Sequence, residues 1–144
     1  MPITTLSPLE IREQFAAPCY LSRVRTGFPS PADDYMDKKL DLNEFLIKHP
    51  ASTFYCWTEG ESMEGVGIYD RDLLIVDREE QARHQDVVLA FLDGELTCKI
   101  LDAHRRLLCS AHEDFPPIPI LDGSDFQIEG VVINAIHFFR HRTG

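Results

Sequence analysis

The fold of this 144-residue chain is decided by the stretch Asp86-Val87-Val88-Leu89-Ala90-Phe91-Leu92-Asp93-Gly94-Glu95-Leu96-Thr97-Cys98-Lys99-Ile100-Leu101. Two runs rich in apolar and β-branched residues flank the Asp93-Gly94 pair. An Asp-Gly pair between such runs is the strongest short-range signal for a β-hairpin. The stretch therefore predicts two antiparallel strands joined by a tight turn.

Further β-type runs lie on both sides of this hairpin in the sequence. They occupy residues 52–58, 73–77, 106–110 and 126–139. One short helix precedes them, because Asp41-Leu42-Asn43-Glu44 supplies an N-cap pattern and Pro50 closes the element. We therefore expect a mostly β fold: a small, strongly twisted, antiparallel sheet domain.

The first part of the chain differs from this body. Ser7 and Pro8 have the types expected at the cap and first position of a short helix over residues 6–18. The following Gly27-Phe28-Pro29-Ser30-Pro31 resists helix formation, because each proline biases the residue before it to an extended conformation. We therefore expect an N-terminal arm over residues 1–26 and a β-rich domain over residues 27–144.

Composition and charge exclude several classes of protein. Hydrophobic residues make up 44% and charged residues 26%, which is typical of a folded domain. A net charge of −10 argues against direct binding to a nucleic-acid duplex. No run approaches the length of a membrane span, and the four cysteines lack metal-ligand or disulfide spacing, so we expect a cytoplasmic protein with reduced thiols.

The first candidate for chemistry is Ser62, in Gly60-Glu61-Ser62-Met63 between two predicted strands. A serine beside glycine at a strand end can expose its hydroxyl while neighbouring N–H groups stabilise an oxyanion. The alternative is a turn serine that bonds its own backbone.

The second candidate is Lys99. Strand alternation places Thr97, Lys99 and Leu101 on one face and residues 96, 98 and 100 on the other, and apolar residues on both faces make a partly desolvated lysine plausible. Burial must lower the pKa of a lysine from about 10.4 to about 7 or 8 before the amine acts as a general base. The alternative is an edge-strand lysine that blunts strand pairing.

Both candidates belong to a longer series of runs that resembles the UmuD branch of the LexA/UmuD self-cleaving peptidases, over residues 22–138. The runs that carry the resemblance are Gly27-Phe28-Pro29-Ser30-Pro31-Ala32-Asp33-Asp34-Tyr35, Asp41-Leu42-Asn43, Leu46-Ile47-Lys48-His49-Pro50, Gly60-Glu61-Ser62-Met63, Asp72-Leu73-Leu74-Ile75-Val76-Asp77, Asp93-Gly94-Glu95-Leu96-Thr97-Cys98-Lys99 and Gly130-Val131-Val132-Ile133.

The resemblance implies a Ser–Lys dyad in which Ser62 is the nucleophile and Lys99, in its neutral form, is the general base. The N–H groups around Glu61 and Ser62 would hold the oxyanion, and the chain would cut its own Thr26–Gly27 bond. Family members usually carry a small residue or cysteine before that glycine and often aspartate before the serine, so Thr26 and Glu61 depart from the pattern.

The resemblance also implies a role and partners. The protein would be a homodimer in the cytoplasm, stimulated by RecA on single-stranded DNA during the SOS response to DNA damage. Loss of the arm would convert it into the accessory subunit of an error-prone translesion polymerase with a UmuC-like catalytic subunit. No cofactor, metal ion, membrane or sequence-specific DNA contact is implied.

Three other kinds of function stay open at this point. One is a non-catalytic interaction module masked by its arm. Another is a signal peptidase, which the lack of an apolar anchor disfavours. The third is a LexA-type repressor, for which a 26-residue arm is too short to hold a helix-turn-helix domain.

Several other polar residues receive simpler interpretations. His137 and His141 have a helical ligand spacing but lie in a β-type run, which disfavours a metal site. Asp70 and Asp72 are expected in a solvated turn. Cys98 is expected to fill the core from the strand face opposite Lys99.

Charge is also distributed unevenly along the chain. Residues 1–26 hold three arginines and two glutamates, a net charge of +1, which leaves −11 for residues 27–144. We therefore expect docking of the arm on the acidic body to weaken as salt rises.

Overall fold

The structure is a computed structural model that describes residues 3–8, 15–20 and 36–140. The chain divides into two compact units. One unit comprises residues 1–9 and 51–144, and the other comprises residues 10–50. The boundary expected between residues 26 and 27 lies outside the described residues and stays a prediction.

The larger unit is built on one antiparallel sheet with the strand order β1-β4-β5-β10-β6-β7-β8-β9. Its strands are β1 (Ile3–Pro8), β4 (Thr53–Thr58), β5 (Leu73–Asp77), β6 (Val87–Leu92), β7 (Glu95–Asp102), β8 (Leu107–Cys109), β9 (Ile118–Pro119) and β10 (Phe126–Ile136). Two short 3-10 turns, η1 (Pro50–Ser52) and η2 (Glu64–Val66), precede and follow β4. The expectation of a mostly β, antiparallel fold is confirmed.

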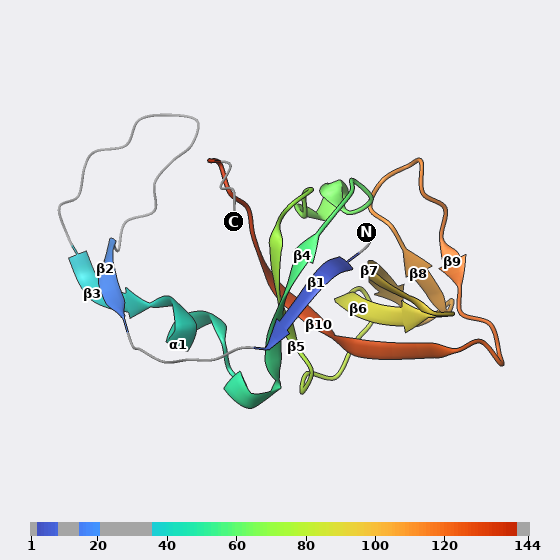
Figure 1. The fold of residues 1–144 in the computed structure, drawn as a ribbon, viewed down its shortest axis with the longest axis horizontal. Helices are drawn as coiled ribbons and strands as arrows, with labels where there is room; N and C mark the ends of the chain where they lie inside the picture. Colours follow the sequence, from blue (N-terminus) through green and yellow to red (C-terminus); the bar gives the residue numbers. More distant parts are fainter. Residues whose placement is uncertain (1–2, 9–14, 21–35, 141–144) are drawn as a thin grey trace. The chain divides into compact units, whose positions relative to one another are not determined.

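The long strand β10 joins the two halves of this sheet. It pairs with β6 over its first half and with β5 over its second half, and Figure 1 shows it running beside both. The register of β10 shifts between Ile128 and Gly130 and again between Val132 and Asn134. Because such irregularities increase local twist, β10 curves the sheet as the strand passes from β6 to β5.

The sheet buries apolar residues on both faces. Along β6, Leu89 lies in one core cluster, whereas Val88 and Ala90 lie in a second cluster. Along β7, Cys98 belongs to the first cluster and Leu101 to the second. Successive side chains of a strand point to opposite faces, so the two clusters lie on opposite faces of these strands. The core position expected for Cys98 is confirmed.

The hairpin predicted from the Asp-Gly pair is present as β6 and β7. Leu92 pairs with Glu95 across the turn, and Val87 pairs with Ile100 at the far end. Asp93 and Gly94 have φ angles of 48° and 89°. Positive φ at both central residues defines the turn whose twist matches two antiparallel strands, which is why this dipeptide was a strong signal.

The smaller unit contains the hairpin β2 (Ala16–Tyr20) and β3 (Met36–Asp41), followed by α1 (Leu42–Leu46). The Asp41 carboxylate accepts hydrogen bonds from the N–H groups of Asn43 at 3.0 Å and Glu44 at 3.4 Å, which confirms the predicted N-cap. The helix ends before Pro50, because Ile47 already has an extended backbone with φ −115° and ψ 106°.

The helix expected over residues 6–18 is wrong wherever the structure describes that segment. Ser7 and Pro8 end strand β1, which pairs with β4, and residues 16–20 form β2. Short helices are marginal in water, whereas pairing with the edge of β4 supplies the backbone of β1 with hydrogen-bond partners.

Helices that could cross a membrane were sought among the described residues, and none of the helices there is long and apolar enough to do so.

Candidate active site

Ser62 and Lys99 lie side by side, although 37 residues separate them in sequence. Nζ of Lys99 donates to Oγ of Ser62 at 3.5 Å, the outer limit of hydrogen-bond distance. Ser62 is only 3% exposed and Lys99 only 6%. Ser62 comes from the loop between β4 and β5, and Lys99 from β7. The two sequence-predicted candidates therefore share one buried location.

A second hydroxyl completes this group. Oγ of Ser110, the residue after β8, accepts a hydrogen bond from Nζ of Lys99 at 2.6 Å. The pairing of β7 with β8 explains the contact, since Ile100 lies opposite Cys109 and the next residues on either side are Lys99 and Ser110. Ser110 was not among the predicted site residues, because pairing the predicted 95–101 and 106–110 strands end to end sets it opposite Thr97, and only the observed register places it beside Lys99.

The side chain of Lys99 is largely removed from water. Lys99 is only 6% exposed, and the centre of the Phe115 ring lies 5.8 Å from Nζ. Among the residues that the structure describes, no carboxylate lies within ion-pair distance of Nζ. Nζ therefore has hydroxyl groups and an aromatic ring near it, and no carboxylate of a described residue at ion-pair distance.

The Ser62 loop is attached to the segment that carries Ser110 by two backbone hydrogen bonds. The N–H of Ala111 donates to the carbonyl of Ser62 at 2.7 Å, and the N–H of Gly65 donates to the carbonyl of Ala111 at 3.0 Å. A Cβ at position 65 would collide with that same carbonyl oxygen. Glycine is therefore required at position 65 for the loop to approach this closely.

The far end of the loop is held by Asp72, and the sequence interpretation of this residue was wrong. Asp72 was expected in a solvated turn, but it is 0% exposed. One carboxylate oxygen lies 2.6 Å from Nδ1 of His137, and the other accepts the N–H of Tyr69 at 2.8 Å. The loop folds so that Asp72 lies inside the protein. Its carboxylate therefore contacts the backbone N–H of Tyr69 and the imidazole of His137, the residue after β10, instead of water.

Asp70 behaves as expected of a turn residue, since its side chain is half exposed. Its carboxylate also accepts the N–H of Gly60 at 2.8 Å. On the other side of the turn, the hydroxyl of Thr58 donates to the carbonyl of Tyr69 at 2.8 Å. Both ends of the loop that carries Ser62 are thereby closed by side-chain to backbone bonds.

The backbone donors near Ser62 are available for a ligand. Within the described part of the chain, the N–H groups of Glu61 and Ser62 donate to no other residue. Unused N–H groups beside a buried serine hydroxyl are what the stabilisation of an oxyanion requires.

A hollow of about 490 Å³ adjoins this loop. Its lining is rich in carboxylates and is formed by Glu64, Gly65, Tyr69, Ala111, His112, Glu113 and Asp114. Since this segment is bonded to the backbone of Ser62, the hollow offers an acidic surface beside the candidate nucleophile.

The neighbouring thiols are poor nucleophiles at neutral pH. Burial raises the pKa of Cys98 to about 12 and also raises the pKa of Cys56 to about 12. A thiol attacks as its thiolate, which these groups hold in very small amounts near pH 7. Cys98 therefore does not compete with Ser62, although it adjoins Lys99 in sequence.

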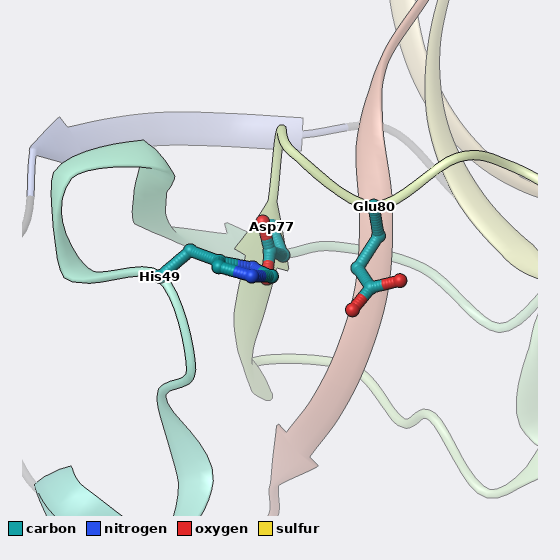
Figure 2. Close-up of side chains that lie close together, drawn as sticks. All are labelled: His49, Asp77 and Glu80. Carbon is teal, nitrogen blue, oxygen red and sulfur yellow. The ribbon is translucent and has the colours of Figure 1, made fainter.

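A separate pair of carboxylates marks the other end of β5. Figure 2 shows Asp77, the last residue of that strand, and Glu80 in the loop beyond it; His49, also labelled there, belongs to the other compact unit. Asp77 is fully buried, and its carboxylate accepts the N–H of Glu79 at 2.9 Å. This bond stabilises the turn that leaves the strand, and two carboxylates are fewer ligands than a metal ion takes in a protein-built site.

Three of the residues singled out in the sequence lie outside the described part of the chain. The expected cleavage site, Thr26–Gly27, lies outside the described residues, as does His141. His137, its expected spacing partner, contacts Asp72 and stacks near the ring of Tyr69 at 4.9 Å between ring centroids.

Comparison with known proteins supports the resemblance noted in the sequence. The Peptidase S24-like family model matches residues 18–133. Protein ImpA of Salmonella typhimurium is 41% identical over 125 residues, which cover 87% of this chain and 86% of ImpA. Protein SamA of Salmonella typhimurium is 39% identical over 92% of this chain and 93% of its own length.

More distant similarity extends to a repressor. The LexA repressor of Idiomarina loihiensis is 34% identical over 119 residues, which cover 81% of this chain and 58% of the repressor. The family match covers most of the chain and includes both Ser62 and Lys99. This chain belongs to the S24 family of peptidases.

Proposed function

We propose that this protein is a self-cleaving serine endopeptidase in which Ser62 and Lys99 form the catalytic dyad. Its substrate is its own Thr26–Gly27 bond, which separates an arm over residues 1–26 from residues 27–144. The observation that carries the proposal is the 3.5 Å approach of the Lys99 amine to the Ser62 hydroxyl in a buried location.

The chemistry follows from the atoms present. Neutral Nζ of Lys99 takes the proton of Ser62 as Oγ attacks the carbonyl carbon of Thr26. The N–H groups of Glu61 and Ser62 hold the oxyanion that forms. The ammonium then gives its proton to the amide nitrogen of Gly27, the C–N bond breaks, and Thr26 remains as an ester on Ser62.

Water completes the reaction. Lys99, neutral again, takes a proton from a water molecule that attacks the ester, and it returns this proton to Oγ of Ser62 as the ester bond breaks. The products are the arm with a carboxylate at Thr26 and a chain that begins at Gly27. Because the substrate is tethered, effective concentrations on the order of 10⁵ to 10⁸ M can replace substrate binding.

The biological role is proposed from the family. As a UmuD-like member, the protein would act as a homodimer in the cytoplasm, with cleavage stimulated by RecA on single-stranded DNA during the SOS response. The shortened chain would serve as the accessory subunit of an error-prone translesion polymerase, beside a UmuC-like catalytic subunit. The similarity to ImpA and SamA along most of their lengths supports this placement over a LexA-type repressor.

Mass spectrometry of the purified full chain tests the enzyme. We expect incubation at mildly alkaline pH to yield a fragment that begins at Gly27, because more of the amine is then neutral. Ser62→Ala and Lys99→Ala should stay whole. Matched controls are Ser52→Ala, before β4, and the exposed Lys48→Ala, which should cleave like the parent.

Two outcomes would contradict the proposal. Cleavage by Ser62→Ala would exclude the assigned nucleophile. A parent that stays whole both alone and with RecA bound to single-stranded DNA would instead favour a non-catalytic module whose interaction surface the arm masks.

Charge adds a further prediction about this reaction. The hollow beside Ser62 contains Glu64, Glu113 and Asp114, and the arm carries a net charge of +1. Unassisted cleavage should therefore slow as NaCl rises from low to about 0.5 M, since exposed charges are screened beyond about 4–10 Å over this range. Equal cleavage rates by gel densitometry at both salt concentrations would show that charge attraction does not contribute to docking of the arm.

A further inference from the structure

The hydroxyl of Ser110 has no part in the reaction described above, yet it makes the shorter of the two hydrogen bonds that link the proposed base to described side chains. It lies 2.6 Å from Nζ of Lys99, nearly 1 Å closer than the hydroxyl of Ser62 at 3.5 Å. The contact is built into the strand pairing, because Lys99 and Ser110 occupy the next opposed positions after Ile100 and Cys109.

We propose that Ser110 is a positioning residue that orients the Lys99 amine toward Ser62, an inference that rests on the proposed function. A neutral amine has two N–H groups and one lone pair. When one N–H donates to Oγ of Ser110, rotation about the last carbon–nitrogen bond is restricted. The lone pair can then be held toward the hydroxyl of Ser62, where the proton must be taken.

The short distance does not make Ser110 a rival nucleophile. A serine nucleophile needs free N–H donors beside it to hold the oxyanion. The N–H that follows Ser110 belongs to Ala111 and already donates to the carbonyl of Ser62 at 2.7 Å. The N–H groups of Glu61 and Ser62 donate to no described residue, so the donors are available at Ser62.

The same hydroxyl acts on the charged form of the amine. As an acceptor, Oγ of Ser110 stabilises the ammonium more than the neutral amine, because hydrogen bonds to charged groups are stronger. Among the described residues, the hydroxyl of Ser62 at 3.5 Å and the ring of Phe115 at 5.8 Å also lie near Nζ, and both are farther from it than Oγ of Ser110 at 2.6 Å. Loss of the Ser110 hydroxyl therefore removes the shortest of these contacts.

Ser110→Ala should change two quantities, the maximal rate of self-cleavage and the pH at which the rate is half-maximal. The maximal rate of self-cleavage should fall about 10- to 100-fold, because the amine is no longer oriented. The pH of half-maximal rate should move about one pH unit lower, because the ammonium loses an acceptor and gives up its proton more easily. Ser110→Thr keeps a hydroxyl and should restore both quantities to within about threefold and a few tenths of a pH unit of the parent.

A second measurement does not depend on cleavage. NMR of the Lys99 side chain against pH should be compared between Ser62→Ala and the double variant Ser62→Ala/Ser110→Ala, both of which stay whole. The titration midpoint should be lower in the double variant, with thermal unfolding midpoints confirming that both chains are folded. Equal midpoints, or a Ser110→Ala pH profile identical to that of the parent, would overturn the role of Ser110.

The outcomes for the two proposals can be told apart. Cleavage by Ser62→Ala refutes the proposed function whatever Ser110→Ala does. An inactive Ser62→Ala together with a Ser110→Ala variant that matches the parent in rate and pH profile refutes only the positioning role.

Discussion

The two members of the proposed dyad are positioned by very different means. Ser62 lies in an irregular loop that is held by separate bonds from Asp70, Asp72 and the backbone of Ala111. Lys99 lies within β7, where pairing with β6 and β8 fixes its register. The loop depends on individual contacts from distant parts of the chain, whereas the strand depends on a repeating ladder that tolerates the loss of one contact.

This difference predicts where a substitution does most harm. In the loop, a single collision can move the nucleophile away from the base. In the strand, the backbone ladder keeps Lys99 in register even when a neighbouring side chain changes. Three substitutions test this comparison, from the largest expected effect on cleavage to the smallest.

Gly65→Ala should break the loop. The added Cβ collides with the carbonyl oxygen of Ala111, so the loop must move away from the segment that holds Ser110. We expect self-cleavage to fall more than about 100-fold, since small displacements of reacting groups carry costs of that size. We also expect the free energy of unfolding to fall by about 1–3 kcal/mol, measured by urea denaturation.

Gly123→Ala is the matched control for this substitution. Gly123 has a φ of 82° but no atom within 4 Å of an added Cβ, so the variant carries backbone strain without a collision. The free energy of unfolding of Gly123→Ala should fall by about 1–2 kcal/mol. Its rate of self-cleavage should equal that of the parent. If Gly65→Ala cleaves like Gly123→Ala, the close approach at position 65 does not hold the nucleophile.

Cys98→Ala should alter the core side of the strand while cleavage continues. Burial raises the pKa of Cys98 to about 12 from its ordinary 9.0, as it does for Cys56. The stability that a protonated buried thiol provides is full below pH 9 and is lost as the pH rises from 9 toward 12, because only the unfolded chain then ionises. Each such thiol contributes up to about 1.4 kcal/mol per pH unit in that window.

The parent should therefore lose stability above pH 9 more steeply than Cys98→Ala, measured as the free energy of unfolding against pH. At pH 7 the variant should be destabilised by about 1–2 kcal/mol through the lost packing. Cleavage at pH 8 should stay within about threefold of the parent. A loss of cleavage comparable to that of Lys99→Ala would show that the thiol, and not only the strand, supports the reaction.

Asp102→Asn, at the turn between β7 and β8, should have the smallest effect on self-cleavage. The backbone N–H of Arg105, which donates to this carboxylate at 3.0 Å, lowers the pKa of Asp102 below its ordinary 3.8. The stabilisation is therefore present above pH 4 and is lost as the pH falls below that value. The urea midpoint of the parent should exceed that of the variant at pH 7, and the two should converge toward pH 2.5; a constant difference would contradict the assignment.

The contrast between loop and strand also explains what the sequence could predict. The Asp93-Gly94 turn and strand alternation located Lys99 and the core position of Cys98, because both signals are local and periodic. The fold class followed from the same runs. Ser62 was found only through its motif and the family resemblance, since nothing periodic marks a residue in a loop.

The missed features all depend on contacts between distant segments. The local sequence predicts a solvated turn for Asp72, because its partner, His137, is 65 residues away in sequence. Ser7 and Pro8 form a valid local cap and so predict a helix where the structure has the first strand, because only pairing with β4 overrides that signal. Ser110 carried no motif and became visible once the β7–β8 register was known.

The first strand gives the proposed reaction an unusual product. Residues 3–8 form one of the two edge strands of the large sheet, paired in antiparallel fashion with β4. A cut between Thr26 and Gly27 severs the peptide that contains this strand from every other strand of the sheet. Hydrolysis and departure of the arm would then be separate events, because the cut arm would still pair through β1 with β4 and through β2 with β3. The lifetime of these two ladders, rather than the rate of the chemical step, would determine when the β4 edge becomes available to a new partner.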